Sequence, residues 1–146
     1  MKKFLVRSVI VIAGVVVACQ LVPYGREHSN PPNTAEPKWD RTATRELAVR
    51  ACFDCHSNES TWPWYSHVAP ASWLVQNHVD EGRRALNFSD WSRNYREADE
   101  AGEVVLAGEM PPRSYTLLHP EARLTSAEKH ALAEGLNATV GAGRHE

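Results

Sequence analysis

The sequence predicts an all-α fold in one compact domain. Apolar residues recur at helical spacing in several segments, and these segments begin and end with residues that favour helix termini. No run of alternating apolar and polar residues reaches the length of a strand. The chain has 146 residues, of which 42% are hydrophobic, so it can bury one core but is too short for several domains.

The first 22 residues have the pattern of a membrane-targeting segment. Lys2, Lys3 and Arg7 precede a run from Val9 to Cys19 without a charged residue. Because a basic flank stays in the cytoplasm, we expect the rest of the chain on the periplasmic face of the cytoplasmic membrane. An uncleaved signal anchor is the favoured interpretation. The alternatives are a lipoprotein with lipid on Cys19 and a cleaved signal peptide.

Residues 23–39 are expected to form an extended linker, because the part from Tyr24 to Trp39 contains three prolines and an Asn-Pro step. The domain proper then spans residues 40–146. Its first helix is expected to begin near Asp40 or Thr42, either of which could cap it, and to run to Cys52.

Three further helices are expected in the domain. The second begins at Pro70, because proline suits the start of a helix, and runs to about Leu86. Ser89 is expected to cap the third, and Gly108 to end it, because glycine accepts the left-handed conformation that closes many helices. The fourth begins at residues 125–128, whose Thr-Ser-Ala-Glu sequence matches a capping box.

The charge balance points away from nucleic acid. Sixteen Lys and Arg residues face eighteen Asp and Glu residues, which leaves a net charge of -2. A chain with this balance has no basic excess to neutralise phosphates, so we expect no nucleic-acid partner. The hydrophobic fraction also argues against a disordered chain.

The candidate chemistry is concentrated in Cys52-Phe53-Asp54-Cys55-His56. Two thiols three residues apart lie on one side of a helical turn, which is the spacing needed to add across the two vinyl groups of one haem. The adjacent His56 can place its imidazole on the iron. The sequence therefore predicts one covalently attached haem c, with Cys52 and Cys55 as attachment sites and His56 as the proximal ligand.

Three other roles are known for closely spaced cysteines. A zinc site needs about four ligands, and no second cysteine pair completes one, although His67, His78 and His119 could contribute. A thioredoxin-like dithiol needs a strand ahead of the pair, and the pattern offers none. A disulfide suits an oxidising compartment but leaves His56 without a role.

Met110 is the candidate ligand for the opposite face of the iron. Apart from the initiator it is the only methionine in the chain. It lies in Gly108-Glu109-Met110-Pro111-Pro112, where proline disfavours a helical backbone and a stiff loop would present the thioether. The alternatives are a methionine that fills a gap in the core, or ligation by His67, His78 or His119.

Aromatic and basic residues near these motifs are candidates for the haem surroundings. We expect the rings of Trp62, Trp64 and Tyr65 to exclude water from the macrocycle, although each could equally be a core or interface anchor. Arg83 or Arg84 could pair with a haem propionate, but a solvated helix face is the favoured interpretation.

A series of short motifs covers most of the chain after Trp39. They are Cys52 to His56, Ser57-Asn58-Glu59, Trp62-Pro63-Trp64-Tyr65-Ser66, Ala69-Pro70, Ser72-Trp73, Glu81-Gly82-Arg83, Leu86-Asn87-Phe88-Ser89, Trp91, Gly108-Glu109-Met110-Pro111-Pro112, Tyr115 and His119-Pro120. Together these motifs resemble the bacterial haem-binding domain family of small membrane-anchored, cytochrome c-like proteins. The resemblance implies a cytochrome c-like fold of about four helices, thioether bonds at Cys52 and Cys55, and His56 and Met110 as iron ligands.

Two function classes follow from these residues. In the favoured one, a haem with His and Met ligands passes single electrons between partner proteins at the membrane, and the chain is a carrier rather than a catalyst. In the other, the distal position is vacant or labile, and the protein is a peroxidase-like enzyme or a gas sensor. A peroxidase needs a distal acid or base, and only His67 or His119 could serve.

Overall fold

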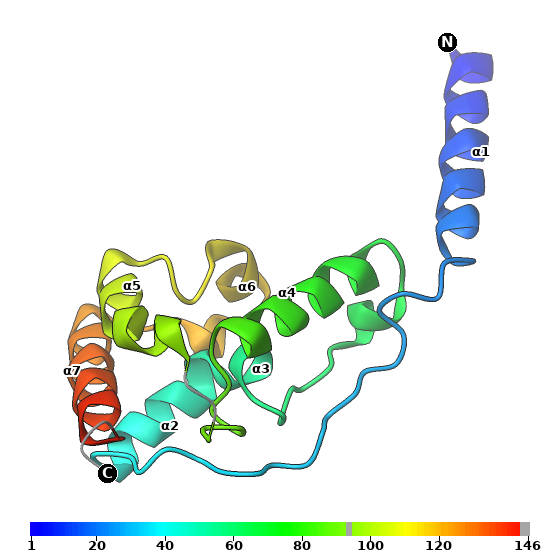
Figure 1. Cartoon of the computed structure of the whole chain (residues 1–146). Coiled ribbons are helices and arrows are strands. Elements are labelled where there is room, and N and C mark those ends of the chain that lie inside the picture. The colour runs from blue at the N-terminus through cyan, green and yellow to red at the C-terminus, as the bar shows by residue number, and fades with distance from the viewer. Residues whose placement is uncertain (93–94, 144–146) are drawn as a thin grey trace.

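Helices carry the regular structure of the chain in the computed structural model, which describes residues 1–92 and 95–143 (Figure 1). The described residues form no strand and contain an isolated parallel bridge between Ala35 and Asp90. The predicted all-α class is therefore confirmed. The elements are α1 (Lys2–Cys19), α2 (Thr42–Ala51), α3 (Phe53–His56), α4 (Ala71–Ala85), α5 (Ala101–Ala107), α6 (Arg113–Leu118) and α7 (Ser126–Gly143), with short 3-10 turns η1 (Trp64–His67), η2 (Arg96–Glu100) and η3 (Pro120–Ala122).

Helix α2 begins where the sequence predicts, but neither of the two predicted residues caps it. Its N-cap residue is Arg41, and no side-chain hydrogen bond among the described residues caps its first turn. The Asp40 carboxylate instead accepts a hydrogen bond of 2.8 Å from the Arg41 guanidinium. The helix ends at Ala51, and Cys52 breaks the helical backbone before the single turn of α3.

The predicted boundaries of the later helices are met in part. Helix α4 follows Pro70 as expected. Ser89 does not cap the third helix, because its hydroxyl accepts a hydrogen bond of 3.0 Å from the Asn58 amide. The helical turns begin only at Arg96, and residues 93–94 of the predicted helix lie outside the described residues. Gly108 does end α5, in the left-handed conformation with φ of 76°.

The capping box at the start of α7 is confirmed. The Thr125 amide donates to the Glu128 carboxylate at 2.7 Å, and the Glu128 amide donates to the Thr125 hydroxyl at 3.3 Å. The two residues thus satisfy amides that the first turn of a helix leaves without partners.

A layer of stacked rings backs the turn formed by α3. Phe53 of this turn stacks on Phe88 with ring centroids 5.5 Å apart, and Phe88 stacks on Trp91 at 6.0 Å. Burial of each phenylalanine contributes roughly 1.5–3 kcal/mol, so the rings fix α3 against the core. Helix α7 packs against α5 and α2 on the other side of that core (Figure 1). The buried cluster is Ala48, Phe53, Leu86, Phe88, Ala98, Ala101, Val105, Leu132, Leu136 and Val140.

Helix α4 approaches the α3 turn very closely at Gly82. A Cβ atom added there would lie 2.5 Å from the carbonyl oxygen of Cys55. This is far inside van der Waals contact, so glycine is what allows the two backbones to meet. The approach brings the C-terminal half of α4 against the predicted haem-attachment residues.

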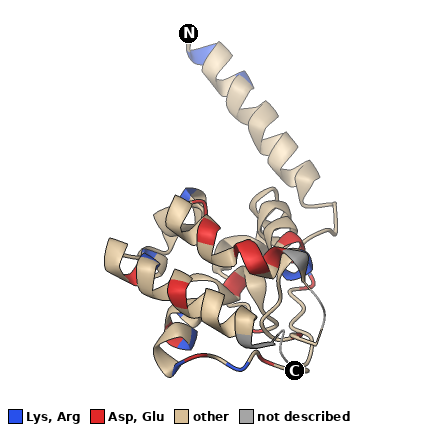
Figure 2. Ribbon diagram, turned by 60° about the vertical axis from the view of Figure 1, so that its left-hand side comes forward, with Lys and Arg blue, Asp and Glu red and all other residues tan. Residues whose placement is uncertain are grey.

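Helix α1 stands apart from the domain, and none of its 18 residues, all of which are described, is buried (Figure 1). Its basic residues lie at its N-terminal end, and the rest of the helix carries no Lys, Arg, Asp or Glu (Figure 2). Over the described part of the chain, no helix meets the length and apolarity required to span a bilayer.

The segment between α1 and α2 runs along the domain, hydrogen-bonded to it at several points. The Gln20 amide group donates to the Ala69 carbonyl at 2.8 Å, and the Asn30 side chain donates to the Ser60 carbonyl at 2.9 Å. The Thr34 amide bonds the Ser89 carbonyl at 2.9 Å. The segment is therefore part of the folded unit and is not a free, solvated spacer.

Candidate functional site

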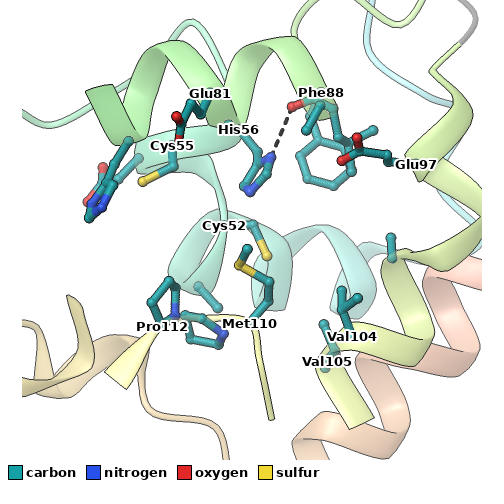
Figure 3. Close-up of a pocket in the computed structure, with 18 of the residues that line it drawn as sticks. Cys52, Cys55, His56, Glu81, Phe88, Glu97, Val104, Val105, Met110 and Pro112 are labelled. Atoms are coloured by element: carbon teal, nitrogen blue, oxygen red, sulfur yellow. Dashed lines mark hydrogen bonds between the residues drawn. The ribbon is translucent and has the colours of Figure 1, made fainter. Parts of the chain in front are cut away.

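A cavity of about 270 Å³ lies between α3, α4, α5 and the loop that follows α5. Cys52, Cys55, His56 and Met110 all line it, although Met110 is far from the others in the sequence (Figure 3). The structure thus brings together the four site residues that the sequence singles out. Much of the remaining wall is apolar, with Ala51, Ala85, Leu86, Phe88, Ala101, Val104, Val105 and Leu136.

Cys52 and Cys55 belong to one helical turn. The amides of Cys55 and His56 donate to the Cys52 carbonyl at 3.1 and 2.8 Å, and both cysteines are free thiols. Burial, with a contribution from neighbouring Cys55, raises the pKa of the Cys52 thiol to about 12. Burial, with a contribution from Asp54, raises the pKa of the Cys55 thiol to about 11. Both groups are therefore protonated at neutral pH.

His56 presents one nitrogen to the cavity. Its Nδ1 lies 3.0 Å from the carbonyl oxygen of Leu86 (dashed line in Figure 3). Because a carbonyl can only accept, Nδ1 carries the proton, and the lone pair is on Nε2. Burial lowers the pKa of the imidazole, which favours the neutral form. A neutral imidazole with a fixed tautomer is ready to bind a metal through Nε2.

A buried polar network holds the Leu86 carbonyl in place. The Phe88 amide donates to the His56 carbonyl at 2.8 Å. The Asn87 side chain donates to that of Asn58 at 2.9 Å. The hydroxyl of Ser89, which binds the Asn58 amide, completes the link between the segment after His56 and the loop after α4. Local sequence patterns gave no signal for these contacts, because they join residues about 30 positions apart.

Arg83 neither faces solvent nor stands free to pair with a haem propionate, because its guanidinium bonds other segments of the chain. Its guanidinium donates to the Ser57 carbonyl at 2.7 Å, the Ser29 carbonyl at 2.9 Å and the Ser60 hydroxyl at 3.0 Å. The expected solvated face is therefore wrong for Arg83, which cross-links the segment after the cysteine pair to the segment before α2. Arg84 is exposed.

Met110 lies across the cavity from His56 (Figure 3). The amides of Glu109 and Met110 both donate to the carbonyl of Val104, at 3.0 and 3.2 Å, because the left-handed Gly108 turns the chain back over the end of α5. The Met110 side chain is 36% exposed, so it is at the edge of the cavity rather than in the core. It can offer a thioether from the side opposite the imidazole.

None of the three rings expected around the haem, Trp62, Trp64 and Tyr65, lines this cavity. Trp62 and Tyr65 instead line a neighbouring pocket, together with Cys55. Trp64 is 79% exposed, and Trp62 stacks on His28 with ring centroids 4.7 Å apart. Among the described residues, the aromatic rings that line the cavity belong to Phe88 and Tyr115, along with the imidazoles of His56 and His78. The sequence placed the rings by proximity to the cysteine pair, but from Ser60 to Tyr65 the chain lines the neighbouring pocket and not the first cavity.

Of the three other candidate histidines, one lies in the cavity and two lie outside it. His78 lines the cavity. His67 packs edge-on against His28 at 4.3 Å, and His119 bonds the Tyr65 hydroxyl at 2.8 Å. In the described part of the chain, no three His, Cys, Asp or Glu side chains gather to hold a metal ion by themselves.

The donor set of the cavity fits a haem. Two protonated thiols lie on one turn, an unprotonated imidazole nitrogen is fixed beside them, and a thioether lies opposite within a largely apolar wall. Comparison with known families agrees with this chemistry, because the sequence model of a family described as a haem-binding domain matches residues 14–138. Neither the curated proteins nor the solved structures gave a match.

Proposed function

Because the chain belongs to the haem-binding domain family, we propose that it is a c-type monohaem protein that transfers single electrons. The observation that carries the proposal is the convergence of Cys52, Cys55, His56 and Met110 on one cavity. When bound, the haem supplies one-electron redox chemistry at its iron. The cavity residues attach, orient and shield it.

In this proposal the two thiols form the covalent attachment. Each S–H group adds across one C=C bond of a haem vinyl group, so that a C–S bond forms and the hydrogen goes to the other vinyl carbon. No electrons are exchanged and no group leaves. Burial keeps both Cys52 and Cys55 in the thiol form, and the α3 turn sets their spacing.

His56 and Met110 are the proposed iron ligands. The Leu86 carbonyl holds the His56 tautomer with Nε2 free, and the loop after α5 offers the Met110 sulfur from the other side. Sulfur ligation and an apolar wall that includes Phe88 and Val105 both raise a reduction potential, because they disfavour the more highly charged ferric state.

The two histidines considered for a peroxidase, His67 and His119, do not line the cavity. A peroxidase needs an acid or base beside the distal face. His67 contacts His28, and His119 is engaged by Tyr65 and by Glu121 at 2.9 Å. Among the described residues, His56 and His78 are the histidines that line the cavity, so His78 is the remaining histidine candidate for a distal acid or base.

We also propose that residues 1–22 direct the domain to the outer face of the cytoplasmic membrane. The support is the basic N-terminal end of α1 (Figure 2) and the exposure of the apolar side chains that follow it. Mass spectrometry of membrane fractions should recover the intact N-terminal peptide. A lipid on Cys19 would instead establish the lipoprotein alternative.

Spectroscopy of the purified holoprotein tests the electron-transfer proposal. We expect a low-spin ferric state with a Met-to-iron charge-transfer band, and loss of that band in Met110→Ala. Leu117→Ala, which truncates an exposed side chain away from the cavity, is the matched control and should retain the band. A high-spin resting state with rapid peroxide turnover would contradict electron transfer and favour a peroxidase.

A further inference from the structure

Helix α6, which follows the Met110 loop, has little apolar packing to hold it. None of its six residues, all of which the structure describes, is buried. Leu117 and Leu118 are 72% and 62% exposed. A segment with so few buried apolar contacts is free to open locally unless other interactions fix it. The polar contacts of α6 therefore decide where it sits.

The strongest such contact joins α6 to the turn that carries the cysteine pair. The Tyr115 hydroxyl donates to the Asp54 carboxylate at 2.5 Å, and Asp54 lies between Cys52 and Cys55. Burial and the bond to Asp54 raise the pKa of Tyr115, so the phenol remains a donor. A hydrogen bond to a charged acceptor is about twice as strong as a neutral one.

Asp54 is itself fixed. Its second carboxylate oxygen accepts a hydrogen bond of 2.9 Å from the Thr61 amide, and its main-chain carbonyl accepts one of 2.7 Å from the Ser60 hydroxyl. The acceptor for Tyr115 is therefore held by the same segment that carries the attachment residues. Motion of α6 relative to that segment requires this bond to break.

A second contact supports the Tyr115 ring. The ring stacks on His119 with centroids 4.3 Å apart and planes 11° apart. His119 is held in turn by the Tyr65 hydroxyl at 2.8 Å and by Glu121 at 2.9 Å. Tyr115 is thus restrained both at its hydroxyl and across its face.

We propose that Tyr115 is a positioning residue for Met110. On one side of the loop the Met110 amide donates to the Val104 carbonyl, and on the other side the Tyr115 hydroxyl bonds α6 to Asp54. These two hydrogen bonds hold the Met110 loop across the cavity from His56 and resist its withdrawal. This inference rests on the proposed function, since it assumes that Met110 is an iron ligand.

Imidazole binding to the ferric holoprotein tests this proposal, because added imidazole competes with a distal thioether for the iron. We expect Tyr115→Phe to bind imidazole about tenfold more tightly than the native protein, which matches the loss of one hydrogen bond to a charged group. The charge-transfer band of Met110 should weaken at the same time. Asp54→Asn, which keeps an acceptor oxygen but loses the charge, should give a smaller change in the same direction.

Tyr24→Phe is the matched control. Tyr24 also donates to an aspartate, Asp80 at 3.3 Å, but this bond is remote from the Met110 loop. The variant should leave imidazole affinity and the band unchanged. If Tyr115→Phe behaves like Tyr24→Phe while the native protein shows the Met110 band, the positioning role is wrong and the proposed function stands. If the native protein lacks a band that depends on Met110, both proposals are wrong.

Discussion

Replacement of Gly82 by alanine should separate α4 from the turn that carries the proposed haem-attachment residues. The added Cβ would meet the Cys55 carbonyl oxygen at 2.5 Å and the carbonyl carbon at 2.9 Å, whereas ordinary contacts begin at 3.4 Å. Both atoms belong to the backbone, so a side-chain rotation cannot relieve the overlap. One of the two backbones has to move.

The expected free-energy change combines two opposing effects. Alanine in place of glycine stabilises a helix interior by about 1 kcal/mol. Overpacking of a tight contact costs about 1–3 kcal/mol. The upper part of that range applies here, because the added atom clashes with backbone. We therefore expect Gly82→Ala to lower the free energy of unfolding by about 1–2 kcal/mol.

Urea unfolding of Gly82→Ala and Gly141→Ala side by side measures this effect. A Cβ added at Gly141 meets no atom within 4 Å, so this control keeps the helix-propensity gain without the clash. We expect the unfolding midpoint to fall in Gly82→Ala and to stay level or rise in Gly141→Ala. Equal stability of the two variants would refute the close approach of α4 to the Cys55 carbonyl.

Three further predictions concern acid stability, the polar network and the attachment. The Thr125 amide and Arg50 hold the pKa of Glu128 at about 2, so its stabilisation is complete above the ordinary carboxyl pKa near 4.5 and is lost as the pH falls towards 2. Acid titration of Glu128→Gln should show a smaller loss of folding stability over that pH range than the native protein shows. An equal loss in the two proteins would contradict a stabilising role for the Glu128 carboxylate. Asn58→Ala leaves buried polar groups without partners, so we expect a loss of about 1–3 kcal/mol in urea unfolding, which a neutral substitution would disprove. Cys55→Ser should leave haem bound through one sulfur, and peptide mass spectrometry that finds no haem on the remaining cysteine would oppose this.

The elements that the sequence predicted well are those with local causes. The capping box of α7, the left-handed Gly108 and the start of α4 after Pro70 each depend on residues within one turn of the boundary. The Cys52 to His56 motif is local in the same way. Met110 could be placed opposite it because the chain has no other internal methionine.

The features that sequence reasoning missed depend on contacts between distant segments. Ser89 has the composition of a helix cap, but its hydroxyl is taken by Asn58, 31 residues earlier. Arg83 has the spacing of a surface residue, yet it binds carbonyls that come from two other segments. Tyr115 and Asp54 are 61 residues apart, and no periodicity links them.

The intact mass of the holoprotein, produced in a host that assembles c-type haem, tests the central claim most directly. We expect the mass of the polypeptide plus one haem, with colour that stays on the chain after acid denaturation, and loss of both in the Cys52→Ser, Cys55→Ser double variant. A mass equal to the polypeptide alone, with haem that acid extracts, would contradict covalent attachment through these two cysteines.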